Sequence, residues 1–238
     1  FKAKCSLNPE VKIKKAEKPK KIVVVGGGPA GMEFARVANL RGHSVTILER
    51  SSELGGNLIA ASAPEFKLDL RKYLEWLKKQ LRGVEIVLNF EATAERIEEL
   101  NPDLVVDAVG SEHDLPEIPG IENAVKAVDV LTGKVNVGRK VAILGGGRVG
   151  CETALHLAEG REVTILEALP EIALDLERNY RFALIRELKM KNVKWICNFK
   201  AEKIDQKSIV GQSNGKKIEI EIDSLVIATG MRARKLEG

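Results

Sequence analysis

IVVVGGGPAG, the stretch at residues 22–31, joins a run of β-branched residues to a glycine-rich turn. Such a run is typical of a buried parallel strand, and the glycines let the backbone turn sharply into a helix that begins near Pro29. In this arrangement Gly26 makes the tight turn, Gly28 lets the backbone approach a phosphate, and Gly31 lets the helix pack on the strand. The N–H groups at the start of the helix then face the anion. The stretch therefore predicts a pyrophosphate-binding strand–turn–helix unit.

An acidic residue follows at the end of the next strand. Val45–Leu48 reads as that strand, and Glu49 comes directly after it, about 20 residues beyond the first glycine. A carboxylate at this position can accept hydrogen bonds from an adenosine ribose. A glycine motif alone is weak evidence, since a glycine turn can serve packing only. The complete order of strand, glycines, helix, strand and acid predicts a dinucleotide site.

The same order recurs in the second half of the chain. Residues 141–150 read VAILGGGRVG, and the strand Val163–Leu166 is followed by Glu167. The spacing from first glycine to acid is nearly equal in the two copies, and two such units are a far stronger signal than one. Gly110 and Gly230 each close a later strand at its carboxyl end, where ligands of doubly wound sheets bind. The sequence thus predicts an α/β protein with two Rossmann-like domains.

Breaks in these patterns divide the chain into four segments. We expect a linker tail from a preceding domain over residues 1–20 and a first dinucleotide domain, which lacks its C-terminal part, over residues 21–137. A second dinucleotide domain follows over residues 138–232, and residues 233–238 start the return to the first domain. Within them we expect a helix over 66–82, a loosely ordered crossover over 125–137, and an antiparallel excursion with alternating segments at 201–204 and 217–222.

Composition and charge argue against several function classes. The 238 residues are 44% apolar, enough to bury a core, and no apolar run approaches the roughly 20 residues of a membrane helix. Much of the small +4 charge lies in the lysine-rich run at 12–21, which favours a solvated linker over a nucleic-acid contact because only Phe1 is a nearby aromatic. Cys5, Cys151 and Cys197 form no C-x-x-C pair, which argues against dithiol chemistry and for a reducing compartment. We therefore expect a cytoplasmic protein that binds neither nucleic acid nor membrane.

Further motifs indicate a family. They are Cys5–Pro9, Lys18–Lys21, Val24–Glu33, Arg41–His43, Glu53–Gly56 and Ala63–Pro64. Over nearly the whole chain, these residues resemble the C-terminal half of the 2,4-dienoyl-CoA reductase, trimethylamine dehydrogenase and 2-enoate reductase group, which are NADH:flavin oxidoreductases related to old yellow enzyme. The resemblance implies the disulfide-reductase-like flavoprotein fold, in which two three-layer β/β/α domains bind dinucleotides and the second is inserted in the first. It also implies that FAD occupies one domain and NAD(H) the other, so that a hydride passes between them.

The resemblance implies site residues in both domains. Residues matching the FAD site are Gly26, Gly28, Gly31, Glu49, Arg50, Gly55, Gly56 and Gly110. Residues matching the NAD(H) site are Gly145, Gly147, Gly150, Glu167, Thr229 and Gly230. Glu152 matches a carboxylate near the nicotinamide in related flavoenzymes and is the catalytic candidate, although a helix dipole also favours an acid in the first turns. Because Glu167 would accept from a free 2′-hydroxyl and repel a 2′-phosphate, we expect NADH rather than NADPH.

The resemblance further implies parts of a larger enzyme. In that group an FMN-binding barrel precedes this half, with a 4Fe-4S cluster between them. Cys5 matches the last cluster cysteine, its alternative being a free thiol in a tail, and a Gly-Asp motif that contacts the flavin falls after Gly238. Electrons from NADH would then pass through FAD, cluster and FMN to an enoyl-CoA, an enoate or a similar acceptor. The alternative function is a non-catalytic module that binds ADP or another nucleotide, as in some amine dehydrogenases.

Overall fold

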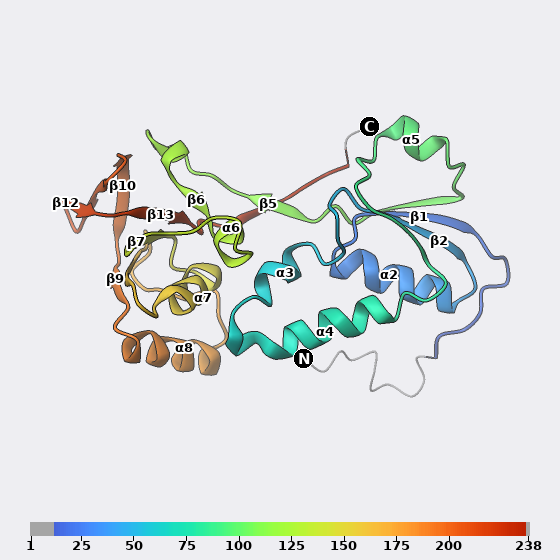
Figure 1. Cartoon of the computed structure of the whole chain (residues 1–238), viewed down its shortest axis with the longest axis horizontal. Helices are drawn as coiled ribbons and strands as arrows, with labels where there is room; N and C mark the ends of the chain where they lie inside the picture. The colour runs from blue at the N-terminus through green and yellow to red at the C-terminus, as the bar shows by residue number, and fades with distance from the viewer. Residues whose placement is uncertain (1–11, 237–238) are drawn as a thin grey trace. The chain divides into compact units, whose positions relative to one another are not determined.

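The computed structural model describes residues 12–236, so Cys5 lies outside the described residues. The chain forms two compact units (Figure 1). Unit 1 contains the chain up to Ile59, Asp69–Gly110 and the residues from Arg234 on, and unit 2 contains Ala60–Leu68 and Ser111–Ala233. The chain therefore leaves unit 1 twice, and unit 2 is inserted in it. The units divide at Gly110, whereas the domain boundary predicted from the sequence lies at residue 137.

Unit 1 is built on a parallel sheet in the order β3-β2-β1-β4. Its elements are β1 (Lys21–Val25), α2 (Pro29–Leu40), β2 (Ser44–Leu48), α4 (Leu68–Lys79), β3 (Glu85–Val87), α5 (Ala94–Glu98) and β4 (Leu104–Asp107). Alternate residues of β1 serve two cores, because successive side chains of a strand point to opposite faces. Val24 packs with Leu77 of α4 on one face, and Val23 packs with Ile97 of α5 on the other. This two-sided burial explains the unbroken apolar run.

Unit 2 has three layers around a parallel sheet in the order β6-β13-β7-β8-β9. The sheet strands are β6 (Val125–Lys126), β7 (Lys140–Leu144), β8 (Glu162–Leu166), β9 (Lys194–Ile196) and β13 (Ser224–Ile227). The helices are α6 (Ala127–Leu131), α7 (Arg148–Leu157) and α8 (Arg178–Met190), and the antiparallel layer is β10 (Phe199–Ile204), β11 (Ser208–Ser213) and β12 (Lys216–Glu221). Ile143 of β7 faces the helical core, whereas Leu144 faces Phe199 and the antiparallel layer. The predicted β/β/α arrangement is therefore confirmed in this unit.

Short elements complete both units. They are α3 (Asn57–Ala61), the 3-10 turns η1 (Glu65–Lys67) and η2 (Ile121–Asn123), and the antiparallel pair β5 (Ser111–His113) and β14 (Met231–Ala233). The segment with η1 belongs to unit 2, although α4, which follows it, lies almost entirely in unit 1. Over residues 12–236, no helix combines the length and the apolar character needed to cross a membrane.

Three expectations about local structure need correction. The crossover at 125–137 is not loosely ordered: it contains β6 and α6, and β6 pairs with β13, a hundred residues away in sequence. The antiparallel layer has a third strand, β11, between the two predicted segments. The helix expected over 66–82 begins as the turn η1 and continues as α4. In the first two cases strand pairing decides the structure, and strand propensity depends strongly on such context.

Candidate functional site

The first and third glycines of both turns are required by packing. Gly26 and Gly145 have φ angles of +109° and +105°, a region that favours glycine. A Cβ on Gly26 would lie 2.3 Å from the Ala108 carbonyl oxygen. A Cβ on Gly31 would lie 2.0 Å from the Gly26 carbonyl oxygen, and one on Gly150 would lie 1.9 Å from that of Gly145. Turn, helix and strand end are thus in direct backbone contact in each unit.

The middle glycines are open. Among the described residues, a Cβ on Gly28 would meet no atom within 4 Å, and the nearest atoms to one on Gly147 would be those of the Asp175 carboxylate, at 3.5 Å or more. These are the positions where a Rossmann turn needs close approach of backbone and pyrophosphate. Packing within the described residues therefore does not require a glycine at Gly28 or Gly147.

Each predicted acid is bonded to its own glycine turn. Glu49 is 7% exposed and accepts hydrogen bonds from Gly27 N at 2.6 Å and from Ser51 N at 2.8 Å. Burial opposes ionisation of Glu49, but the hydrogen bonds from Ser51 and Gly27 outweigh it and lower the pKa of this carboxyl group. Glu167, 8% exposed, accepts from Gly146 N at 2.5 Å in the same way. The acids therefore hold the second strand end against the turn in both units.

Two of the remaining predicted residues of the FAD site, Gly55 and Gly56, contact the same turn of unit 1. Gly55 N donates to the Gly27 carbonyl oxygen at 2.9 Å, and a Cβ on Gly56 would lie 3.1 Å from the Cα of Gly28. Arg50 follows Glu49 and is exposed. Gly110 ends unit 1 after β4 with a φ of +76°, and its carbonyl oxygen accepts from Arg234 N at 2.9 Å.

Thr229 and Gly230 lie beside the second turn. A Cβ on Gly145 would lie 3.0 Å from Thr229 N. Thr229 Oγ1 donates to the Asp114 carbonyl oxygen at 2.7 Å, and the Gly230 carbonyl oxygen accepts from Asp114 N at 3.1 Å. The carboxyl end of β13 is thereby fixed next to the glycine turn of unit 2, where the predicted NAD(H) residues come together.

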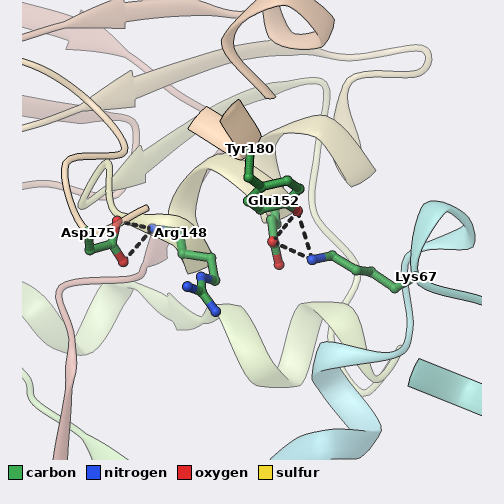
Figure 2. Close-up of polar contacts among 5 residues, drawn as sticks. All are labelled: Lys67, Arg148, Glu152, Asp175 and Tyr180. Atoms are coloured by element: carbon green, nitrogen blue, oxygen red, sulfur yellow. Dashed lines mark hydrogen bonds and ion pairs between the residues drawn. The ribbon is translucent and has the colours of Figure 1, made fainter. Parts of the chain in front are cut away.

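Glu152 lies in a buried polar cluster that the sequence did not predict (Figure 2). It belongs to α7 and is 8% exposed. Its Oε1 accepts from Lys67 Nζ at 2.5 Å and from the Tyr180 hydroxyl at 2.6 Å, and Lys67 Nζ is 2.8 Å from the same hydroxyl oxygen. Lys67 comes from η1 and Tyr180 from α8. Partners 85 and 28 residues away leave no local signal in sequence.

The pKa values of Lys67 and Tyr180 are both raised in this cluster. Burial opposes the Lys67 ammonium, but the hydrogen bonds with Glu152 and Tyr180 outweigh it and raise the pKa of Lys67. Burial, followed by the hydrogen bond to Glu152, raises the pKa of the Tyr180 hydroxyl. At neutral pH, Lys67 is therefore an ammonium and Tyr180 is a neutral donor. Glu152 is a member of this network, and it lies beyond the first turn of α7, which contains no acidic residue.

The second turn also contains a carboxylate that the sequence did not single out as a site residue. Asp175 precedes α8, and both its oxygens lie close to Arg148 N, at 3.0 and 3.1 Å (Figure 2).

Cys151, one turn along α7, is buried, and burial raises the pKa of its thiol to about 12. That thiol is protonated and unsuited to nucleophilic chemistry. Over residues 12–236 no three His, Cys, Asp or Glu side chains form a group that could hold a metal ion.

Comparison with known proteins identifies relatives that match most of the chain. It is 40% identical to cinnamate reductase from Clostridium sporogenes over 97% of its length, and 44% identical to NADH oxidase from Thermoanaerobacter brockii over 77%. The solved structure of 2-naphthoyl-CoA reductase in complex with 2-naphthoyl-CoA is 36% identical, covers 94% of the chain and superposes with a TM-score of 0.89. The chain spans about a third of each relative, between 31% and 36% of its length. These relatives confirm the resemblance to the 2,4-dienoyl-CoA reductase group.

The fold itself is more widely shared. Thioredoxin reductase from T. acidophilum, 22% identical, covers 90% of the chain with a TM-score of 0.71, and the chain covers 78% of that structure. The family model of pyridine nucleotide-disulphide oxidoreductases matches residues 4–100 and again residues 85–237, which together include both glycine turns. The chain belongs to the pyridine nucleotide-disulphide oxidoreductase family, in the branch that includes the old-yellow-enzyme-related reductases.

Proposed function

We propose that this chain is the NADH-oxidising module of a flavin oxidoreductase, with FAD at the turn of unit 1 and NADH at the turn of unit 2. The domains predicted from the sequence, residues 21–137 for FAD and residues 138–232 for NAD(H), differ from these units chiefly over residues 111–137, which belong to unit 2. The observation that carries the proposal is the duplication of one geometry: an open middle glycine, flanking glycines required by packing, and an acid bonded to the turn. FAD, when bound, accepts a hydride and can release electrons singly.

The turn residues act by binding and orientation. Gly28 and Gly147 leave room for a pyrophosphate beside the helix start, where backbone N–H groups favour an anion. Glu49 Oε2 and Glu167 Oε2 each accept one backbone N–H, from Gly27 and Gly146, and each of these two oxygens has a second lone pair that can accept a ribose hydroxyl. The negative charge of Glu167 would oppose a 2′-phosphate, which favours NADH over NADPH.

Glu152 is the proposed catalytic residue, and its role is to orient the nicotinamide. Both hydrogen bonds described above for this carboxylate use Oε1, supplied by Lys67 and Tyr180. Oε2 can therefore accept an N–H of the nicotinamide carboxamide, since an ionised carboxylate is an acceptor only. In this proposal, Thr229 and Gly230 form the far edge of the same site.

The full-length protein is proposed to extend this module. The relatives, of which the chain covers about a third, are named for reduction of cinnamate and oxidation of NADH, among other reactions. By analogy, a preceding barrel would hold FMN, a 4Fe-4S cluster with Cys5 among its ligands would connect it to FAD, and the acceptor would be an enoate or enoyl-CoA in the cytoplasm. These assignments are testable in the full-length protein by iron and flavin analysis.

The first test is an anaerobic titration of the chain, supplemented with FAD, by NADH and separately by NADPH, with flavin absorbance as the signal. We expect NADH to bleach the flavin and NADPH to do so more slowly. Glu152→Gln should slow the bleaching, whereas Glu162→Gln, at the exposed start of β8, is the control. FAD that binds but stays oxidised under NADH would support the alternative, a module that holds a nucleotide without turnover.

A further inference from the structure

The first N–H of α7 already has an anion as its partner. Asp175 places its two carboxylate oxygens 3.0 and 3.1 Å from Arg148 N (Figure 2). The atoms of the same carboxylate are the nearest described ones to the open middle glycine, 3.5 to 3.7 Å from a Cβ built on Gly147. It therefore lies where backbone N–H groups and a glycine without a side chain would otherwise receive a phosphate.

The turn of unit 1 is different at the same position. Its helix α2 begins at Pro29, which has no N–H to bind an anion, and in the part of the chain that the structure describes no atom lies within 4 Å of a Cβ built on the middle glycine, Gly28. The two turns have the same glycines and the same bonded acid. Within the described residues, the second turn has a carboxylate beside its middle glycine, and the first turn has none. The additional carboxylate therefore lies in the proposed NAD(H) site, whose nucleotide must be exchanged in every cycle.

A carboxylate and a pyrophosphate cannot share this N–H without like charges in close contact. We propose that Asp175 is a resident anion of the NAD(H) site, which NADH must displace and which thereby lowers dinucleotide affinity. The inference rests on the proposed function of unit 2. Because Asp175 is exposed, its side chain can turn to water while the loop keeps its other bonds, among them Ala173 N to the Gly146 carbonyl oxygen at 2.6 Å.

The experiment compares ADP-ribose, which carries a pyrophosphate, with adenosine, which does not. Calorimetric titrations use the full chain with excess FAD present, so that the first turn is filled. Asp175→Asn keeps an acceptor for Arg148 N but removes the charge. We expect it to tighten ADP-ribose binding about tenfold, equivalent to about 1.4 kcal/mol, and to leave adenosine binding within about twofold. The gain should shrink in 1 M salt, where the Debye length is about 3 Å.

The control is Glu171→Gln, which removes the same charge from the same loop at a residue paired with Arg181. It should leave the affinity for ADP-ribose unchanged. Unchanged or weaker ADP-ribose binding by Asp175→Asn, or an equal gain for adenosine, would overturn the inference while the nucleotide site stands. If neither wild type nor Asp175→Asn binds ADP-ribose, the proposed NAD(H) site itself is wrong, and the inference fails with it.

Discussion

Replacing Lys67 by Met would leave Glu152 buried without its cationic partner. Met keeps most of the aliphatic volume of Lys67 but removes the ammonium and both of its bonds, to Glu152 at 2.5 Å and to Tyr180 at 2.8 Å. The Lys67 and Glu152 side chains are 17% and 11% exposed, so water reaches them only in part. The substitution therefore tests whether the cluster stabilises unit 2 as well as orienting Glu152.

The expected loss is about 2 kcal/mol of unfolding free energy at pH 7. A hydrogen bond to a charged group contributes about 1.5–3 kcal/mol, and leaving a buried charge unpaired is costly. Two effects reduce the loss: the partial exposure of the pair, and the Tyr180 hydroxyl, which still donates to Glu152 at 2.6 Å. Tyr180→Phe removes the other bond and should cost about 1 kcal/mol.

The assay is urea unfolding from pH 6 to pH 11 of wild type and variant, in both of which Trp76 of α4 is replaced by Phe, so that the fluorescence followed is that of Trp195 in β9 of unit 2. The folded pKa of Lys67 is raised, so its contribution is fully present below the unfolded pKa of about 10.4 and is lost as pH rises through the higher folded value. The difference between the proteins should therefore be constant at neutral pH and shrink in strong alkali. Lys203→Met removes the exposed pair with Asp205 and, as control, should change stability by less than about 0.5 kcal/mol. An equal loss in both variants, or no loss for Lys67→Met, would refute the reasoning.

Three further predictions concern the turns. Gly150→Ala places a Cβ 1.9 Å from the Gly145 carbonyl oxygen and should abolish stable folding of unit 2 in thermal melts. Gly147→Ala, in contrast, should leave the melting temperature nearly unchanged and weaken NADH binding in titrations. Glu167→Gln should narrow the preference for NADH over NADPH in the flavin-bleaching assay, and an unchanged ratio would contradict the role of its charge. Because the pKa of Glu49 is lowered in the folded state, its ionised carboxylate stabilises the fold above the unfolded pKa of about 4.3, and this contribution is lost as pH falls through the folded pKa. Glu49→Gln should therefore flatten the acid limb of the stability curve, measured by chemical unfolding.

The elements with a local signal could be predicted from the sequence. β1 and β7 are apolar runs because both of their faces are buried, and the helices after them begin at the glycine turns whose packing the motif describes. Glu49 and Glu167 were found for the same reason, since the motif fixes their distance along the chain. Each carboxylate accepts a hydrogen bond from a backbone N–H group of its turn, so this contact does not depend on a particular side chain in the turn.

The rest depends on contacts between distant segments. β6 is ordered by pairing with β13, and two residues of ordinary composition carry no sign of that partner. Lys67 falls within the helix predicted over residues 66–82, and no motif in the sequence marks either Lys67 or Tyr180. Only the fold brings both to Glu152, across separations of 85 and 28 residues. The sequence predicted the acid of the cluster but not the groups that hold it.

The differences between the two turns fit the different lifetimes that the proposed function requires of its two ligands. A flavin stays bound through many cycles, and the turn of unit 1 has a second glycine pair for this: Gly55 bonds to Gly27, and Gly56 lies against Gly28. A nicotinamide nucleotide must leave after each hydride transfer, and the turn of unit 2 instead carries Asp175, an anion ready to return to Arg148 N. Added backbone contacts help a site to retain its ligand, whereas a competing anion such as Asp175 helps a site to exchange its ligand. If so, Asp175→Asn should slow release of oxidised nucleotide at the same time as it tightens binding, because most affinity differences appear in the dissociation rate.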